Sequence, residues 1–240
     1  MKPTVKLGKK FERALALALR VHADDTRKGK RTPYVSHLLG VASLVLMDGG
    51  SEDEAVAALL HDTLEDHPEA VKPEMLRRRF GATVRDIVVS CTDTPAGFEG
   101  GAKPPWRERK EAYIAHIARA SKGARRVALA DKLYNARDLL ADVRRDGPKT
   151  WARFNAGPAD QVWYLRSVLE RARHAGQTGV IVEELERVVA DLAALVEKSS
   201  PKLSGATSPA SRRSSRTRPT RRTNPPTRAG NATRRAAGRR

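Results

Sequence analysis

The sequence predicts an all-α fold, and three observations support this prediction. Apolar residues recur at three- and four-residue spacing through most of the chain before residue 199, which is the period of amphipathic helices. No segment shows the alternation of apolar and polar residues that is typical of a half-buried strand. Glycine and proline punctuate the chain between the periodic segments. At 240 residues and 40% hydrophobic, the chain is long enough for one domain with a sizeable core and a small appendage.

The expected helices follow this punctuation. One of them begins after Ser51, because Ser51 and Glu54 have the spacing of a capping box, and it should continue into the mid-60s. Pro73 opens a short helix, since proline is well tolerated in a first turn, and Gly81 ends it. In chain order we expect helices at 9–23, 34–47, 52 to the mid-60s, 73–80, 83–91, 108–120, 123–142, 158–173 and 179–197, with a long loop at 94–106.

Residues 57–66, with the sequence Ala-Ala-Leu-Leu-His-Asp-Thr-Leu-Glu-Asp, combine an apolar run with a dense polar end. On a helix, residues four apart share a face, so His61 should lie beside Glu65 and Asp62 beside Asp66. Buried charges without partners are costly, and these groups therefore need partners. A divalent metal ion is one partner that would satisfy them.

A second polar set interrupts the apolar helix expected at 123–142. Asp131 follows a buried-type run, and Asn135 and Asp138 lie on the same helix face as Asp131. A carboxylate inside an apolar helix is rare unless it is paired or binds a metal, and both alternatives stay open for Asp131 taken alone. His37, in the first turn of the helix at 34–47, is on its own typical of a core or capping residue.

Together these positions form a candidate metal site from three helices, made of His37, His61, Asp62 and Asp131. Two imidazoles and two carboxylates suit a borderline or hard divalent ion such as Mn²⁺, Fe²⁺ or Zn²⁺. Such an ion pulls the pKa of a bound water toward neutrality, so that the water becomes a nucleophile.

Other charged residues fit the same chemistry. Glu65 and Asp66 lie one turn from the candidate ligands, where they could orient a water or move protons. Arg27 and Lys28, in the polar loop before Pro33, are the first candidates to hold a phosphate group. The combination predicts hydrolysis of a phosphate ester or anhydride.

His, His-Asp and Asp on apolar helices are the signature of HD-domain phosphohydrolases, and the chain resembles the HD hydrolase domain of the RelA/SpoT superfamily. It is most similar to the stand-alone small alarmone hydrolases, which remove the 3′-pyrophosphate of ppGpp and pppGpp. Glu65-Asp66 make the resemblance specific, because HD enzymes at large do not share this pair. The matching stretches are Arg27-Lys28, Thr32 to His37, Ala57 to Asp66, Phe80-Gly81, Leu129 to Asp138 and, more loosely, Trp163-Tyr164.

The resemblance implies an HD-domain helical bundle with a particular set of roles. The implied ligands of Mn²⁺ are His37, His61, Asp62 and Asp131, and the implied catalytic residues are Glu65 and Asp66. The implied substrate-binding residues are Arg27, Lys28, Tyr34 and Asn135. The chain departs from the family at Leu38, where proline is common. It also lacks the synthetase and regulatory domains of the long enzymes, so no alarmone synthesis is expected.

Three other interpretations compete with an alarmone hydrolase. The first is an HD phosphatase acting on another nucleotide, such as NADPH or a nucleoside phosphate, because a metal centre alone does not select the substrate. The second is an inactive enzyme in which Asp131 and His61 form a buried salt bridge. The third, outside enzymes, is a nucleic-acid-binding protein acting through a basic tail.

Residues 199–240 form that tail. They carry twelve basic residues and no acidic residue, so the net charge of +18 falls to +6 for residues 1–198. The tail has almost no apolar residue to offset its chain entropy, and we expect it to be disordered. Weak, salt-sensitive binding of nucleic acid or another polyanion would follow from its charge. The expected domains are 1–175 for the phosphohydrolase, 176–198 for a C-terminal helix packed on it, and 199–240 for the tail.

Cysteine usage and hydropathy suggest a compartment. Cys91 is the single cysteine, so no intramolecular disulfide can form, which fits a reducing environment. The first ten residues have no apolar core of a signal peptide, and no run of about 18 apolar residues exists. We therefore expect a cytoplasmic protein that does not enter a membrane and that acts on a small-molecule nucleotide.

Overall fold

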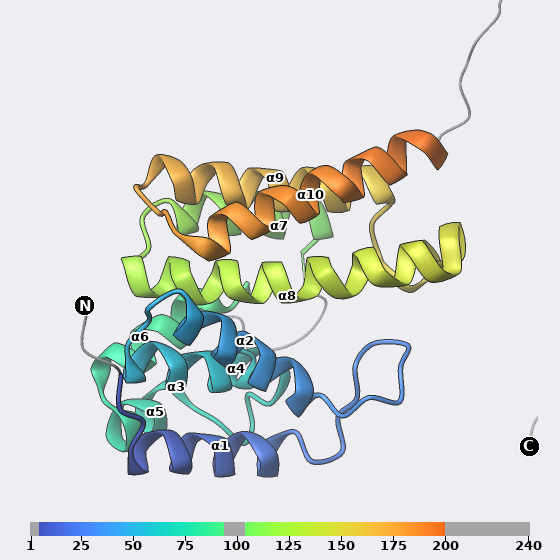
Figure 1. Ribbon diagram of the computed structural model, residues 1–240. Coiled ribbons are helices and arrows are strands. Elements are labelled where there is room, and N and C mark those ends of the chain that lie inside the picture. Colours follow the sequence, from blue (N-terminus) through green and yellow to red (C-terminus); the bar gives the residue numbers. More distant parts are fainter. Residues whose placement is uncertain (1–4, 94–103, 200–240) are drawn as a thin grey trace, which may run out of the picture. The chain divides into compact units, whose positions relative to one another are not determined.

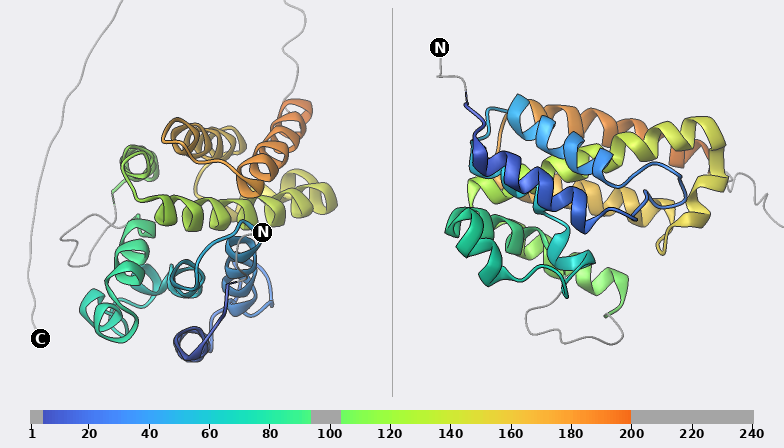
Figure 2. Two further views of the ribbon diagram at one scale, coloured as in Figure 1. Left: turned by 60° about the vertical axis from the view of Figure 1, so that its left-hand side comes forward. Right: turned by 90° about the horizontal axis from the view of Figure 1, so that it is seen from below.

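The computed structural model describes residues 5–93 and 104–199, which pack as helices around the long helix α8. Helix α8 crosses the middle of this part, with α1–α6 on one side and α7, α9 and α10 on the other (Figures 1 and 2). The described helices are α1 (Lys9–Val21), α2 (Val35–Met47), α3 (Glu52–Leu60), α4 (Thr63–Asp66), α5 (Pro73–Phe80), α6 (Ala82–Cys91), α7 (Trp106–Ile117), α8 (Lys122–Asp146), the 3₁₀ helix η1 (Gly147–Arg153), α9 (Pro158–His174) and α10 (Val180–Ser199).

The prediction of an all-α fold is confirmed for these residues. Among them the only extended pairing is an isolated bridge between Thr26 and Pro33, in the loop between α1 and α2. The capping box is also present, because the Ser51 side chain accepts a hydrogen bond from the Glu54 backbone and Glu54 accepts one from the Ser51 backbone. Helix α8 runs four residues beyond the expected end at 142, and η1 fills a stretch for which no helix was expected.

The prediction of one continuous helix from 52 to the mid-60s is wrong. Helix α3 ends at Leu60, and α4 begins at Thr63. Two side chains bond carbonyl groups at this point: Nδ1 of His61 lies 2.8 Å from the Ala58 oxygen, and the Thr63 hydroxyl donates to the Leu60 oxygen at 2.7 Å. Side chains that bond local carbonyls compete with the helical ladder, so the chain turns at His61 and Asp62.

The centre of α8 lies in the core. Val127, Leu129 and Leu133 are fully buried there, and burial of such side chains stabilises the fold by about 1.5–3 kcal/mol each. This packing fixes the polar residues that alternate with the apolar ones on α8, including Asp131. Helix α10 packs against α8 and α9.

The domain boundaries at 175 and 198 stay predictions. The expected disordered tail lies outside the described residues, apart from Ser199, which ends α10. Within the described residues, no helix is long and apolar enough to cross a membrane.

Candidate active site

The four predicted metal ligands meet at one buried point between α2, the α3–α4 turn and α8. Nε2 of His37 lies 3.3 Å from Nε2 of His61 and 3.3 Å from Oδ1 of Asp131. Oδ2 of Asp62 lies 3.0 Å from Nε2 of His61 and 3.5 Å from Nε2 of His37. Asp131 Oδ1 lies 3.6 Å from Nε2 of His61. His37 and His61 are almost completely buried.

The neighbours of these residues orient their ligand atoms. The Ala58 carbonyl can only accept a hydrogen bond, so Nδ1 of His61 carries a proton and Nε2 is the ring nitrogen that faces the cluster. Asp131 is held at both oxygens, with Nζ of Lys132 2.5 Å from Oδ2 and Nδ2 of Asn135 2.5 Å from Oδ1. The His37 and Tyr134 rings make a T-shaped contact, with centroids 4.9 Å apart.

The electrostatics of the cluster favour a bound cation. Burial alone would lower the pKa of His61, but the charges of Asp62 and Asp131 and their hydrogen bonds raise it well above its usual range. Burial alone would raise the pKa of Asp62, but His61 and His37 lower it well below its usual range. The two carboxylates thus hold a positive charge at this point. The imidazole nitrogens of His37 and His61 and the Asp62 carboxylate lie close enough together to hold a metal ion, and Asp131 adds a second carboxylate beside both imidazoles, a donor set that fits a divalent ion.

The predicted catalytic pair lies on the short helix α4, directly after the cluster. Desolvation, followed by the negative charges of Asp62 and Glu65, raises the pKa of Asp66 to about 7, although Asp66 keeps an exposed surface at the rim. Glu65 lies on the same short helix, and its Oε2 is 3.5 Å from the backbone nitrogen of Asp93. A carboxyl group that titrates near neutral pH is suited to proton transfer.

Three of the predicted substrate-binding residues form a chain of contacts to the cluster. Nη2 of Arg27 donates to the Asn135 side-chain oxygen at 2.6 Å, and its guanidinium lies 5.7 Å from the ring centroids of both Tyr34 and Tyr134. The Tyr34 hydroxyl donates to Oδ2 of Asp62 at 2.6 Å. Asn135 in turn bonds Asp131. Tyr34, at the end of the α1–α2 loop, and Asn135 on α8 therefore bond directly to the candidate metal ligands Asp62 and Asp131.

A cavity of about 380 Å³ adjoins these residues. Tyr34 and Asn135 line it and also bond the cluster, so the cavity and the cluster share a border. Lys28 also lines it, with Nζ 5.8 Å from the Phe154 ring centroid. The cationic residues of its lining are Arg27, Lys28, Lys30, Lys110, Lys132 and Arg153, and its aromatic walls include Trp106, Phe154 and Tyr164.

The sequence did not single out Lys30, Lys110, Lys132 or Arg153 as site residues. Lys132 follows Asp131 directly, which is the one sequence signal that could have marked it. The other three come from the α1–α2 loop, α7 and η1, which are far apart in the sequence, and no local sequence pattern marks them as neighbours.

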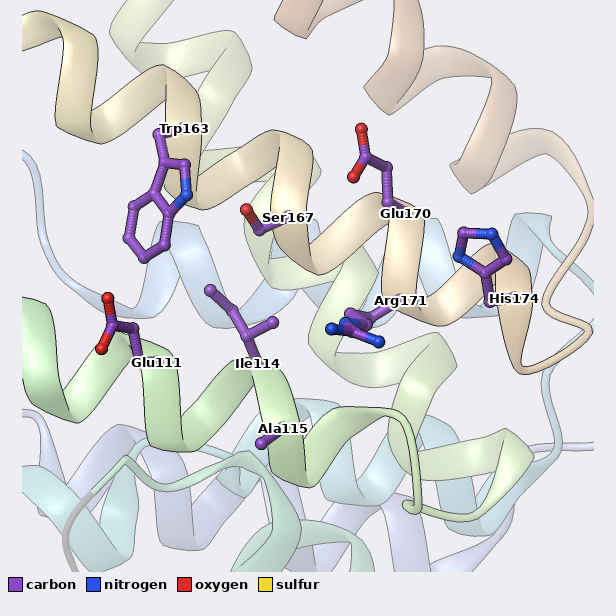
Figure 3. A pocket seen from close by; sticks show the side chains of 8 residues that line it. All are labelled: Glu111, Ile114, Ala115, Trp163, Ser167, Glu170, Arg171 and His174. Atoms are coloured by element: carbon purple, nitrogen blue, oxygen red, sulfur yellow. The ribbon is translucent and has the colours of Figure 1, made fainter.

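A second hollow, of about 550 Å³, lies between α7 and α9. Figure 3 shows Glu111 and Ile114 of α7 facing Trp163 of α9 across it. None of the predicted site residues lines this hollow, so the cavity beside the cluster is the candidate substrate pocket.

Comparisons with known proteins agree with this site. A family model described as HD domain matches residues 14–162. A guanosine-3′,5′-bis(diphosphate) 3′-pyrophosphohydrolase, MESH1, of Xenopus tropicalis is 40% identical over 142 residues, covering 58% of this chain and 72% of the relative. The human MESH1 is 38% identical over 142 residues and covers the same shares of the two chains.

A solved structure gives the same result. It is described as a metazoan ortholog of SpoT that hydrolyses ppGpp, and it matches with a TM-score of 0.62 and 26% identity, covering 78% of this chain and 97% of that one. The family match spans more than half of the chain and contains every one of the predicted site residues. The chain belongs to the HD-domain family, and within it to the RelA/SpoT-related hydrolases.

Proposed function

We propose that this chain is a metal-dependent phosphohydrolase that removes the 3′-pyrophosphate of ppGpp and pppGpp, giving GDP or GTP and pyrophosphate. The observation that carries the proposal is the buried cluster of two imidazoles and two carboxylates that borders a cavity lined by six basic and two acidic side chains. The relatives named for this reaction support the choice of substrate.

In this proposal the metal is held by His37, His61, Asp62 and Asp131, and Mn²⁺ is the ion that the family resemblance favours. When bound, a divalent ion lowers the pKa of water and neutralises charge on a phosphoryl group. Because the ring proton of His61 is committed to the Ala58 carbonyl, its Nε2 is available as a ligand without rearrangement.

The protein's own residues supply positioning and proton transfer. Asp66, with its pKa near 7, takes a proton from the attacking water, and Glu65 beside it helps to orient that water. The cationic groups of the cavity balance the negative charge of the nucleotide's phosphates. Arg27, between the Tyr34 and Tyr134 rings, and Lys28, near the Phe154 ring, are placed to contact the nucleotide.

The test is to incubate the purified chain with Mn²⁺ and ppGpp and to separate the products by anion-exchange chromatography. We expect GDP and pyrophosphate in equal amounts, loss of turnover with EDTA, and recovery when Mn²⁺ is restored. Asp62→Ala should abolish turnover, while Asp86→Ala, at an exposed aspartate on α6, should leave it unchanged. Faster turnover of NADPH than of ppGpp in parallel reactions would refute the alarmone assignment.

Two predictions outside the site belong to the same proposal. The first is that the chain acts in the cytoplasm, on a small-molecule nucleotide as its substrate. The second is that residues 199–240 give weak, salt-sensitive binding to nucleic acid or another polyanion, since their charged residues are all basic. Removing residues 199–240 tests the second, because binding to DNA or RNA that persists in the shortened chain would not come from the tail.

A further inference from the structure

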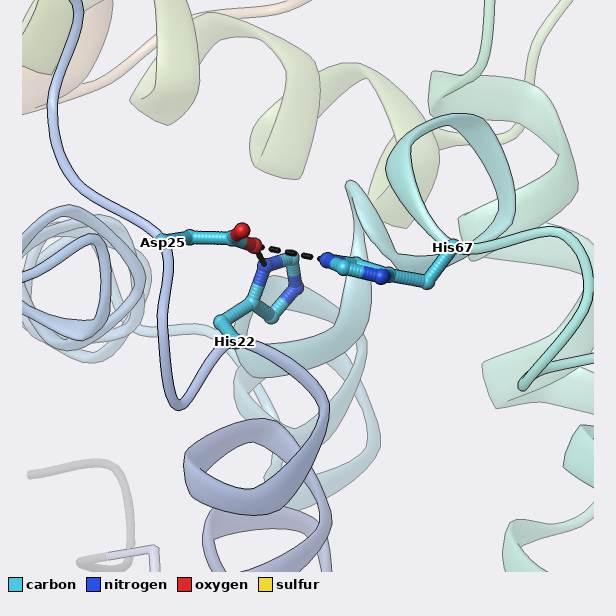
Figure 4. A group of neighbouring side chains, drawn as sticks. All are labelled: His22, Asp25 and His67. Atoms are coloured by element: carbon cyan, nitrogen blue, oxygen red, sulfur yellow. Dashed lines mark hydrogen bonds and ion pairs between the residues drawn. The ribbon is translucent and has the colours of Figure 1, made fainter.

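A second group of metal-ligating side chains lies near the candidate active site and has no part in the proposed hydrolysis. It comprises His22, directly after α1, Asp25 in the following loop, and His67, directly after α4 (Figure 4). Nδ1 of His22 lies 2.7 Å from Oδ2 of Asp25, and Nε2 of His67 lies 2.6 Å from the same oxygen. Two imidazoles and a carboxylate therefore converge, although His67 is 42 residues from Asp25 in the sequence.

We propose that His22, Asp25 and His67 form a second divalent-cation site, which takes a transition-metal ion and for which Zn²⁺ suits the donors best. Two imidazoles with one carboxylate are a known protein ligand set for zinc, and water completes the coordination. The same set without a thiolate disfavours softer ions such as Cu⁺. This site is distinct from the cluster of His37, His61, Asp62 and Asp131, because it shares no residue with it.

The spacing of the three atoms is close to that of a coordination sphere. With metal–ligand distances of about 2.0–2.2 Å, neighbouring ligand atoms lie about 2.9–3.4 Å apart, depending on the geometry. The two contacts to Asp25 are 2.7 Å and 2.6 Å, so each would lengthen by a few tenths of an ångström on binding. Changes of this size need only small side-chain rotations, and no backbone segment has to move.

The surroundings suit the protonation states that ligation requires. If Nε2 of His67 binds the ion, its proton lies on Nδ1, and Oε1 of Glu69 is 3.4 Å from that nitrogen. A carboxylate behind a ligating histidine is the usual outer partner of a protein metal site. Burial lowers the pKa of His22, which favours the neutral imidazole that ligation through Nδ1 requires, with the ring proton then on the buried Nε2.

The site is also accessible. The side chain of His22 is fully buried, whereas those of Asp25 and His67 are 35% and 23% exposed. An ion can therefore enter from solvent and keep water ligands on the open side.

A bound ion would tie the substrate-binding loop to the catalytic helix. Asp25 accepts a backbone hydrogen bond from Tyr34 at 2.9 Å, and the His22 ring stacks on the Tyr34 ring with centroids 5.0 Å apart. His67 follows Asp66 directly in the chain. The second site thus braces both sides of the candidate active site, which gives it a structural role.

Zinc binding by the full-length chain tests the proposal independently of any turnover. His61→Ala weakens the first cluster, so that the remaining sites can be counted by equilibrium dialysis against Zn²⁺ with metal analysis by mass spectrometry. We expect the His61→Ala chain to retain one equivalent that the His61→Ala/His67→Ala chain loses. The matched double variant with His116→Ala, at an exposed histidine of α7, should keep that equivalent.

A milder variant covers the case in which the His67 substitution disturbs folding. Asp25→Asn keeps an oxygen that can accept both hydrogen bonds but removes the charge, so zinc affinity should fall at least about tenfold while the circular dichroism spectrum stays unchanged. Equal zinc content in the His61→Ala chain with and without His67→Ala would overturn the proposal. Unchanged zinc affinity in the His61→Ala/Asp25→Asn chain would overturn it too.

Discussion

The hydroxyl of Tyr34 donates a hydrogen bond to Oδ2 of Asp62, and the two oxygens are 2.6 Å apart. This is the same carboxylate oxygen that lies 3.0 Å from Nε2 of His61, so Tyr34 orients an atom of the candidate metal cluster. Burial and the nearby carboxylates, Asp62 first among them, raise the pKa of Tyr34 far above its usual value, and the hydroxyl keeps its proton at any working pH. Tyr34 thus belongs to the cluster's supporting shell as well as to the wall of the cavity.

Tyr34→Phe should therefore weaken metal binding. Loss of an outer partner that holds a ligand typically costs about 10–100-fold in metal affinity, and we expect the Kd for Mn²⁺ to rise by about tenfold. The measurement is a Mn²⁺ titration followed by electron paramagnetic resonance. Tyr113→Phe is the control, because the buried Tyr113 hydroxyl has no hydrogen-bond partner among the described residues. Equal Mn²⁺ affinity in both variants would contradict this role for Tyr34.

Gly40→Ala should disturb the same cluster from the other side. A Cβ at Gly40 would lie 2.0 Å from Cε2 of Tyr134, and that ring packs against His37. Because an aromatic ring cannot yield locally, we expect a loss of about 1–3 kcal/mol of stability and weaker Mn²⁺ binding. Urea unfolding measures the first effect. Gly157→Ala, where an added Cβ meets nothing within 4 Å, loses only a favourable residue at the N-cap of α9, so it should cost about 0.5–1 kcal/mol and leave Mn²⁺ binding unchanged.

The buried carboxylate of Asp142 should make the stability of the fold decrease as the pH falls. Burial would raise the pKa of Asp142, but hydrogen bonds from Lys30 and Arg153 lower it below its usual range. A lowered pKa in the folded state means that the contribution to stability is present above the unfolded pKa, about 3.9, and is lost as pH falls through the folded pKa. Asp142→Asn should therefore cost about 1–3 kcal/mol at pH 7 and progressively less toward pH 2.

Urea unfolding of both proteins between pH 2 and pH 7 checks this prediction. Asp86→Asn, at an exposed aspartate, serves as the control and should track the unmodified chain at every pH. A difference between the Asp142→Asn and unmodified chains that is the same across the whole range would show that the charge of Asp142 contributes nothing.

Local sequence patterns predict part of the candidate site, and tertiary packing decides the rest. His37, His61, Asp62 and Asp131 were predictable as a set because each is a polar residue in an otherwise apolar helical pattern, and such residues demand a common partner. The turn at His61 was not predictable, since it depends on side chains bonding the Ala58 and Leu60 carbonyls in preference to the helical ladder.

Local sequence patterns could not predict the basic cavity or the group of His22, Asp25 and His67. Lys30, Lys110 and Arg153 come from separate elements, and only the packing of the α1–α2 loop, α7 and η1 brings them to one cavity. His22 and His67 likewise occupy helix ends that the sequence shows to be polar, and nothing local indicates that they share Asp25.

Gly29→Ala should separate substrate binding from stability. Gly29 has φ +70°, a conformation that costs an L-residue about 1–2 kcal/mol, and a Cβ there would lie 2.6 Å from Cδ of Arg153. Arg153 cannot simply swing away, because its guanidinium bonds Asp142 at 2.7 Å. The loop that carries Arg27 and Lys28 must shift instead, so we expect KM for ppGpp to rise several-fold with little change in kcat.

Gly176→Ala is the matched control for Gly29→Ala. Its φ of +80° imposes similar strain, but an added Cβ meets nothing within 4 Å and the residue lies outside the cavity lining. Both variants should lose similar stability in urea unfolding, and only Gly29→Ala should raise KM. A KM that rises equally in both would mean that general destabilisation, and not the position of the Arg27–Lys28 loop, governs substrate binding.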